Sequence, residues 1–209
     1  EYDVYYRMLN AGIRLPASTG SDWYICSANR VYAHTGGPFE YDSWLAALKS
    51  GHTFITNGPA LSLQVGDEGP GAEIETPAGR TLPVVATWQS HYPITRAEVV
   101  CDGNVLAHQT YPEGSTEGRL EADVTVSADA WVAARLSSDT RDSYSQPVFA
   151  HTSPVYLKAG VDGPERAEAA AWFDRNIEAS LEWVGKKGRF YSDKQRREIV
   201  DLFRQGQQV

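Results

Sequence analysis

Asp22 is the residue of this 209-residue chain that could most readily do chemistry. It lies near the end of the run "LPASTGSDW" at positions 15–23, where an apolar stretch enters a glycine-serine turn. A carboxylate on a loop that follows a strand lies where α/β folds hold their active sites, and it could ligate a divalent metal ion. The same carboxylate could instead accept backbone N–H groups and only stabilise the turn. The residues alone leave both interpretations open.

Three further side chains could contact a substrate. Asn29 and Arg30 follow Asp22 closely, and the guanidinium of Arg30 matches phosphate or carboxylate, although it could equally pair with a neighbouring acid. Asn57 precedes Gly58 and could either form a tight turn or reach a substrate. We therefore predict Asn29, Arg30 and Asn57 as substrate-binding residues.

Other reactive side chains form no recognisable local site. No two of the five histidines have the i, i+2 or i, i+4 spacing of local metal sites, although His34 and His52 could approach Asp22 in space. The sequence has no Gly-x-Ser-x-Gly elbow and no glycine-rich phosphate loop. Cys26 and Cys101 are too far apart in sequence for a zinc knuckle or a CxxC pair. Two free thiols are expected, with one long-range disulfide as the alternative. The cysteines therefore do not decide between an oxidising and a reducing compartment.

Elements of mixed α and β type must position these residues. We predict a helix over 3–11, a short buried strand over 13–17, a strand over 30–34, a helix over 42–50 and a strand over 52–56. Residues 1–58 therefore look like the end-piece of an α/β structure.

The pattern changes at Ala60 to short alternating runs separated by Gly, Pro and Asp. About seven such runs predict an antiparallel β-sandwich over 59–160, with Asp102-Gly103 as a hairpin turn and Trp88 and Trp131 in its core. Beyond Gly160, Pro164 begins one apolar-striped helix, and Ser192 with Gln195 caps a second. Residues 161–209 are therefore predicted as an αα-hairpin.

Composition excludes some partners. A formal charge of −8 gives no basic surface for nucleic acid, and no apolar run is long enough to span a membrane. Glu1 is not followed by a secretory signal pattern, so the start is interpreted as cut and export stays open.

Several segments carry a resemblance to a known family. They are "NAGIRLPASTGSDW", "NRVYAHTGGPFEYDSWLAALKSGHTFITNGPALSLQVGDEGPG", "DAWVAARLSSD" and "AHTSPVYL", and the most specific piece is G-x-T-F-x-T-N-G-P at 51–59. Together they resemble the C-terminal half of CehA/McbA-family metallohydrolases, in the PHP (polymerase and histidinol phosphatase) superfamily.

The resemblance implies a distorted β/α barrel that holds divalent Zn, Mn or Fe ions and activates water for hydrolysis of phosphoesters, esters or carbamates. Residues 1–58 would be the end-piece of that barrel. Asp22 matches the aspartate of the family's late Asp-x-His motif, but Tyr24 stands at the histidine position. The other ligands of the family have no match in this chain.

Three hypotheses follow. The first is the C-terminal part of a metal-dependent hydrolase of small molecules or phosphoesters, inactive as this chain alone. The second is a β-sandwich that binds carbohydrate or protein. The third is a metal-free family member that acts as a scaffold, which Tyr24 favours.

Overall fold

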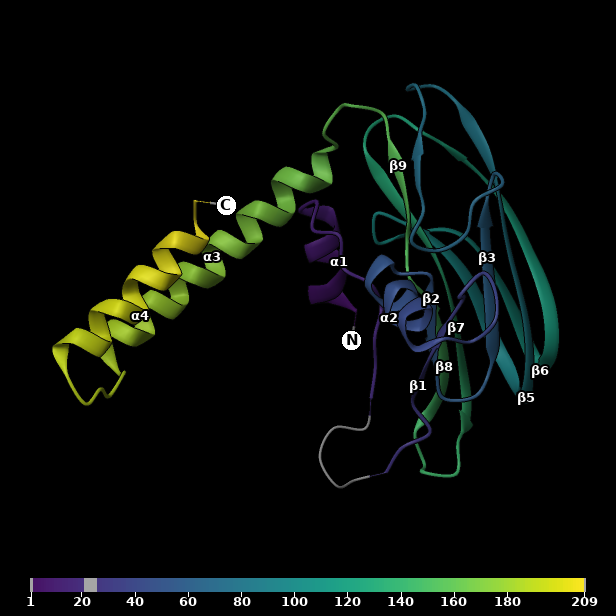
Figure 1. Cartoon of the computed structure of the whole chain (residues 1–209), viewed down its shortest axis with the longest axis horizontal. Coiled ribbons are helices and arrows are strands. Elements are labelled where there is room, and N and C mark those ends of the chain that lie inside the picture. Colours follow the sequence, from purple (N-terminus) through teal and green to yellow (C-terminus); the bar gives the residue numbers. More distant parts are fainter. Residues whose placement is uncertain (1, 21–25, 209) are drawn as a thin grey trace. The chain divides into compact units, whose positions relative to one another are not determined.

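The computed structural model describes residues 2–20 and 26–208. It has two compact units, residues 1–163 and residues 164–209, which we describe separately (Figure 1). The described part of the first unit is a large, mostly antiparallel sheet with two helices, and the second unit is a pair of helices. The predicted mixed α/β class, the sandwich-like sheet and the C-terminal helical pair are confirmed at this level.

The sheet of the first unit contains nine described strands. Its order is β1-β2-β8-β7-β5-β3, with β6 paired to β5 and β9 placed between β7 and β4. Every pairing is antiparallel except β4 with β9. The bounds are β1 Arg30–Ala33, β2 Thr53–Thr56, β3 Ala60–Val65, β4 Glu73–Glu75, β5 Thr81–Cys101, β6 Asn104–Thr125, β7 Ala130–Arg141, β8 Pro147–Thr152 and β9 Val155–Lys158.

The long β5–β6 hairpin joins two parts of this sheet. The first half of β5 pairs with β3, and its second half pairs with β7. The register between β5 and β6 shifts between Gln89 and Ile94, where bulges let the ribbon bend. Alternate side chains of the first half, such as Val84 and Trp88, therefore face one apolar core shared with β7 and β8. The predicted turn is confirmed, because Asp102 and Gly103 both have positive φ, 51° and 86°.

Two helices accompany the sheet. In α1, Asp3–Asn10, Tyr6 and Leu9 pack against Trp131 of β7 in a second, smaller apolar cluster. In α2, Tyr41–Ser50, a capping box joins Glu40 and Ser43 at the start, and Gly51 ends the helix with a left-handed φ of 77°. Both helices agree with the predicted ones.

The described elements differ from the predicted ones in three respects. Residues 13–17 form no strand, and Ile13 is half exposed, because the backbone there is held by side chains instead of a ladder. The short β4 and the strand β8 were not predicted. Two of the alternating runs that predicted separate strands, "LPVVATWQS" at 82–90 and "RAEVVCDG" at 96–103, belong to the single strand β5, which ends at Cys101. In addition, β2 pairs with β8, so strands on both sides of residue 58 share one sheet.

The second unit consists of α3, Pro164–Lys186, and α4, Asp193–Gly206. The Ser192 hydroxyl accepts a hydrogen bond from the Gln195 amide at 3.2 Å, as the predicted cap requires. Gln207 Nε2 donates to Glu178 Oε1 at 2.7 Å, so the two helices lie side by side and antiparallel. Of the helices that the structure describes, none is long and apolar enough to cross a bilayer.

Candidate functional site

The loop that carries Asp22 is the predicted metal-binding element. Asp22 and Tyr24 lie in residues 21–25, outside the residues that the structure describes. Metal ligation by Asp22, and the substitution of Tyr24 for a histidine, therefore stay predictions. The described residues on either side of this segment show how the sheet holds Ala17 before it and Arg30 after it.

The stem before the loop is fixed by two buried hydroxyls. The Ala17 amide donates to Ser153 Oγ at 2.8 Å, and Thr53 Oγ1 donates to the Ala17 carbonyl at 3.1 Å. The two hydroxyl oxygens lie 2.7 Å apart, within hydrogen-bond distance of each other. Thr53 is on β2, and Ser153 directly follows β8. Thr53 of β2 and Ser153 at the end of β8 therefore bind both backbone groups of Ala17, five residues before Asp22. We call these two contacts the Ala17 clamp.

The chain after the loop returns to the same sheet. The Asn29 amide donates to Ser27 Oγ at 3.2 Å, and Arg30 begins β1 opposite Thr56 of β2. Asn29 is half-buried and Arg30 is exposed. The structure thus brings Arg30 to the strand next to the Ala17 clamp, while substrate binding by Asn29 and Arg30 stays a prediction.

Asn57 has a structural role. Its Nδ2 donates to Asp142 Oδ2 and to the Pro147 carbonyl, both at 2.9 Å, and its Oδ1 accepts from the Phe149 amide at 2.8 Å. The residue is buried. Its carboxamide therefore joins the end of β2 to the β7–β8 connection, and these bonds do not favour the predicted substrate contact.

A buried polar network that no sequence pattern predicted includes His151, which follows Ala150 on β8, and Tyr6 of α1. His151 of β8 is fully buried, its Nδ1 lies 2.6 Å from the Thr152 carbonyl, and its Nε2 lies 2.7 Å from Tyr6 Oη. Because a carbonyl only accepts, Nδ1 carries the proton and Nε2 accepts from the Tyr6 hydroxyl. Tyr6 Oη in turn accepts from Arg135 Nη1 at 3.3 Å, and Arg135 pairs with Glu98 at 2.5 Å.

Burial and pairing set the charge states of this network. Burial lowers the pKa of His151 to about 4, so the imidazole is neutral at pH 7. Burial also raises the pKa of Tyr6. Burial alone would raise the pKa of Glu98, but hydrogen bonds from Arg135 and Arg96 lower it below its ordinary value. The network thus carries its charge at Glu98 and the arginines and leaves a neutral imidazole at its other end.

A small pocket connects this network with the stem of the loop. It has a volume of 320 Å³ and is lined by Tyr2, Tyr5, Ile55, His151 and residues 15–18. Tyr5 Oη donates to the Leu15 carbonyl at 3.0 Å. Both ring nitrogens of His151 are already hydrogen-bonded, so this histidine has no free lone pair for proton transfer. The arrangement is suited to holding the stem, not to general base catalysis.

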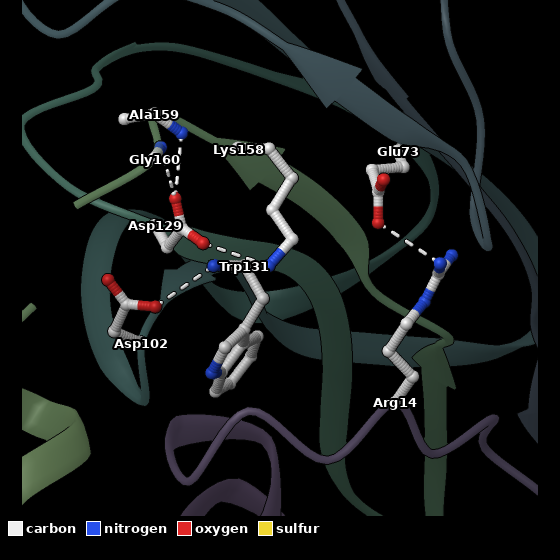
Figure 2. A network of polar contacts seen from close by, with 8 residues as sticks. All are labelled: Arg14, Glu73, Asp102, Asp129, Trp131, Lys158, Ala159 and Gly160. Carbon is white, nitrogen blue, oxygen red and sulfur yellow. Dashed lines mark hydrogen bonds and ion pairs between the residues drawn. The ribbon is translucent and has the colours of Figure 1, made fainter. Parts of the chain in front are cut away.

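Two carboxylates in turns between strands, Asp102 after β5 and Asp129 after β6, also have structural partners (Figure 2). Asp129 Oδ1 accepts from the amides of Ala159 and Gly160, both at 2.8 Å, while its Oδ2 pairs with Lys158 at 2.9 Å. Asp102 Oδ1 accepts from the Trp131 amide at 2.9 Å. These acids fix turns between strands.

The described residues do not fit a complete metal site. Within residues 2–20 and 26–208, no three His, Cys, Asp or Glu side chains gather closely enough to hold an ion. Cys26 and Cys101 are free thiols, as predicted, with Cys26 exposed. His34 and His52 are exposed and line a 580 Å³ hollow with Tyr32 and Phe54, whose rings stack at 5.0 Å. A metal site would need ligands in addition to those described.

Comparison with known proteins leaves the family open. The chain matches no protein-family model and no curated protein. Fibronectin(III)-like modules of Clostridium thermocellum CbhA are 18% identical, with a TM-score of 0.30, over 47% of this chain and 98% of theirs. A CARDB domain from Pyrococcus furiosus is 13% identical, with a TM-score of 0.32, over 48% of this chain and 96% of its own. A Jonesia denitrificans lytic polysaccharide monooxygenase is 14% identical, with a TM-score of 0.30, over 73% of this chain and 93% of its own. At these TM-scores the similarities carry no argument about function.

Proposed function

We propose that this chain is the C-terminal part of a metal-dependent hydrolase similar to the CehA/McbA family of the PHP superfamily. In this proposal residues 1–58 complete a PHP-like barrel, Asp22 ligates a divalent Zn, Mn or Fe ion, and the remaining ligands come from segments outside this chain. The substrate is a small molecule or phosphoester, with Arg30 and Asn29 facing its anionic group.

One observation carries this proposal. The motif on which the resemblance mainly rests, residues 51–59, contains the strand that clamps the stem of the Asp22 loop. Within it Gly51 ends α2, Thr53 binds the Ala17 carbonyl, and Asn57 joins β2 to the β7–β8 connection. The motif therefore supplies the side chain that holds Ala17 against the sheet, five residues before Asp22, which supports a positioned ligand at Asp22.

The surface around β1 and α2 also supports a larger assembly. Tyr32, Phe39 and Tyr41 are 49%, 76% and 66% exposed. In the described sheet β1 pairs only with β2, which leaves its other edge unpaired. Exposed aromatic side chains beside a free strand edge are typical of a surface that another part of a protein covers.

The test uses the full-length protein that contains this chain, with aryl phosphate, ester and carbamate substrates and added Mn²⁺, Zn²⁺ or Fe²⁺. We expect metal-dependent turnover, reduced on the order of 100-fold or more by Asp22→Ala because a ligand is lost. Asp67→Ala, which removes an exposed acid after β3, is the matched control and should have no effect. The 209-residue chain alone should be inactive, and robust turnover by it would contradict the proposal.

The two alternatives make different predictions, which two further measurements test. A metal-free scaffold would bind less than one ion per chain in the full-length protein. A carbohydrate- or protein-binding module is favoured by the hollow beside the stacked Tyr32 and Phe54 rings. It would bind a ligand from a saccharide panel without metal and lose that binding in Tyr32→Ala.

A further inference from the structure

The turn between α3 and α4 has a charge opposite to that of the whole chain. Residues 183–197, which we call the tip, contain six basic residues and one acid, Asp193, a net charge of +5. Since the chain carries −8, all other residues together carry −13. The basic residues of the tip are Lys186, Lys187, Arg189, Lys194, Arg196 and Arg197.

Half of these cations are engaged within the helical pair. Lys186 pairs with Glu182, and Lys194 lies 3.7 Å from Glu198. Arg196 donates to the Gly185 carbonyl at 3.1 Å. The other three, Lys187, Arg189 and Arg197, are exposed, and the described part of the chain places no carboxylate within ion-pair distance of them. The tip thus presents three exposed cations that have neither an ion-pair nor a hydrogen-bond partner among the described residues.

Two large aromatic side chains are exposed at the same tip. Tyr191 is fully exposed, at 101%, and Trp183 is 58% exposed. The tip lies where α3 passes into α4, at one end of the helical pair (Figure 1). Tryptophan and tyrosine have an apolar body and a polar edge, and together with lysine and arginine they favour the interface between water and lipid.

Two acids flank the tip but do not cancel its charge. Glu182 and Glu198 pair with Lys186 and Lys194, and when both acids are counted residues 182–198 still carry +3. The α3 rise places Glu178 about 13.5 Å before Lys187, which exceeds the Debye length of about 8 Å at physiological ionic strength. Asp201 lies only about 6 Å of helix rise after Arg197 and weakens the field of that cation.

We propose that residues 183–197 bind anionic lipid headgroups at a membrane surface. The three free cations supply the attraction to negative charge, and Trp183 and Tyr191 enter the headgroup region. A lipid surface fits better than nucleic acid, because a nucleic acid chain needs a basic track of several successive phosphate contacts. The three free cations of the tip lie within one short turn of a chain that is acidic as a whole. The proposal is independent of the hydrolase function proposed above.

The test is co-sedimentation of the whole 209-residue chain with vesicles in about 0.1 M salt, where the Debye length is about 10 Å. One vesicle set mixes phosphatidylserine with phosphatidylcholine, and the other is phosphatidylcholine alone. We expect binding only to the anionic vesicles, weakened by salt. Changing Lys187, Arg189 and Arg197 together to Gln should lower the partition coefficient on the order of 100-fold, roughly fivefold for each cation.

Two further variants isolate the cause. A control that changes Lys49, Arg175 and Arg204 to Gln removes the same charge from exposed positions away from the tip, and it should lower binding less than about twofold. Trp183→Ser with Tyr191→Ser should weaken binding about tenfold without changing its salt dependence. Far-UV circular dichroism checks that each variant keeps its helices.

Four results would overturn the proposal, three of them in the binding experiments. Those three are equal binding to both vesicle sets, equal loss in the tip and control variants, and oligonucleotide binding that is tighter than vesicle binding at the same salt. Self-association of the chain without lipid, abolished by the tip variant, would assign the tip to an acidic surface of a second copy and would equally overturn it.

Discussion

Residues 1–163 and residues 164–209 bury very different shares of their side chains. The first unit surrounds a continuous apolar core that extends from Leu61 to Leu157. In the second unit only Ala169 and Val184 are buried among the described helical residues, and α4 has no buried residue. The helical pair is therefore held mainly by (i, i+4) pairs and half-buried contacts, which contribute only tenths of a kcal/mol each, and by caps of about 1 kcal/mol.

The two units also differ in whether their polar groups are buried or exposed. The sheet buries Asn57, Glu98, His151 and Ser153 and gives each a hydrogen-bond partner. In the helical pair the ion pairs are exposed, as between Lys186 and Glu182. Buried polar groups are costly to leave unpaired, so the sheet unit should be rigid and sensitive to mutation. The helical unit should open more easily and tolerate substitution.

The largest effect should follow from the tryptophan in the sheet core. Trp88 is 3% exposed and its ring lies over Gly118, where a Cβ would come within 2.1 Å of it. Trp88→Ala should lower the free energy of unfolding by about 3–5 kcal/mol, because it leaves a cavity. Urea unfolding measures this change, with Leu202→Ala, at an exposed site of α4, as the control within about 0.5 kcal/mol.

Trp88→Phe sharpens the same prediction. The indole Nε1 of Trp88 is buried without a hydrogen-bond partner among the described residues, so phenylalanine removes an unsatisfied donor and keeps an aromatic ring. We expect Trp88→Phe to cost less than half of what Trp88→Ala costs. Equal costs would show that the core does not pack around this ring as described.

Acid should destabilise the sheet unit through His151. Its pKa is about 4 when folded and ordinarily about 6.5, so the unfolded chain takes up the proton first as pH falls. The stabilisation is complete above about pH 6.5 and is lost between there and about pH 4, by about 3 kcal/mol in total. Urea unfolding at a series of pH values measures the slope. His151→Gln should flatten it, and an unchanged slope in that variant would assign the effect to another group.

A smaller loss should follow from breaking the Glu98 pairs. The carboxylate of Glu98 is nearly buried and contacts Arg135 at 2.5 Å and Arg96 at 2.6 Å. Glu98→Gln leaves both guanidinium groups without their counter-charge and should cost about 2 kcal/mol, partly offset because Arg96 is 41% exposed to water. The exposed pair of Arg119 and Glu121 supplies the control, and Glu121→Gln should change unfolding by less than about 0.5 kcal/mol. Similar losses in both variants would remove the contrast between buried and exposed pairs.

The smallest effect should appear in the helical unit. Ser192→Ala removes the N-cap of α4 and should cost this unit about 1 kcal/mol. Hydrogen exchange with mass spectrometry should show faster exchange in peptides from residues 164–209 and unchanged exchange in residues 30–160. Faster exchange in both regions would mean that the two units unfold together.

Local patterns in the sequence were sufficient for much of the fold. The Asp102-Gly103 turn, the cap at Ser192 and the alternation in β3 each depend on neighbouring residues, and each was predicted. The strand expected at 13–17 was wrong, because apolar residues there suggested a ladder that the Ala17 clamp replaces.

The candidate site was less predictable because its contacts join distant parts of the chain. Tyr6 and His151 are 145 residues apart, and Thr53 and Ser153 are 100 apart. No periodicity connects such pairs, and a lone histidine in the run "PVFAHT" gives no sign that it is fully buried. Asn57 showed its turn role in the Asn-Gly-Pro sequence, but its bond to Asp142 required the folded sheet.

The pairing of β2 with β8 has a consequence for synthesis. Phe54 lies opposite Thr152, so the strand "TFIT" cannot find its partner until about 100 more residues have been translated. At about 5–20 residues per second this takes about 5–20 s, whereas the β5–β6 hairpin can close as soon as it leaves the ribosome. The clamp on Ala17 should thus be among the last contacts to form. During that interval an apolar strand edge is open to chaperones and to neighbouring nascent chains.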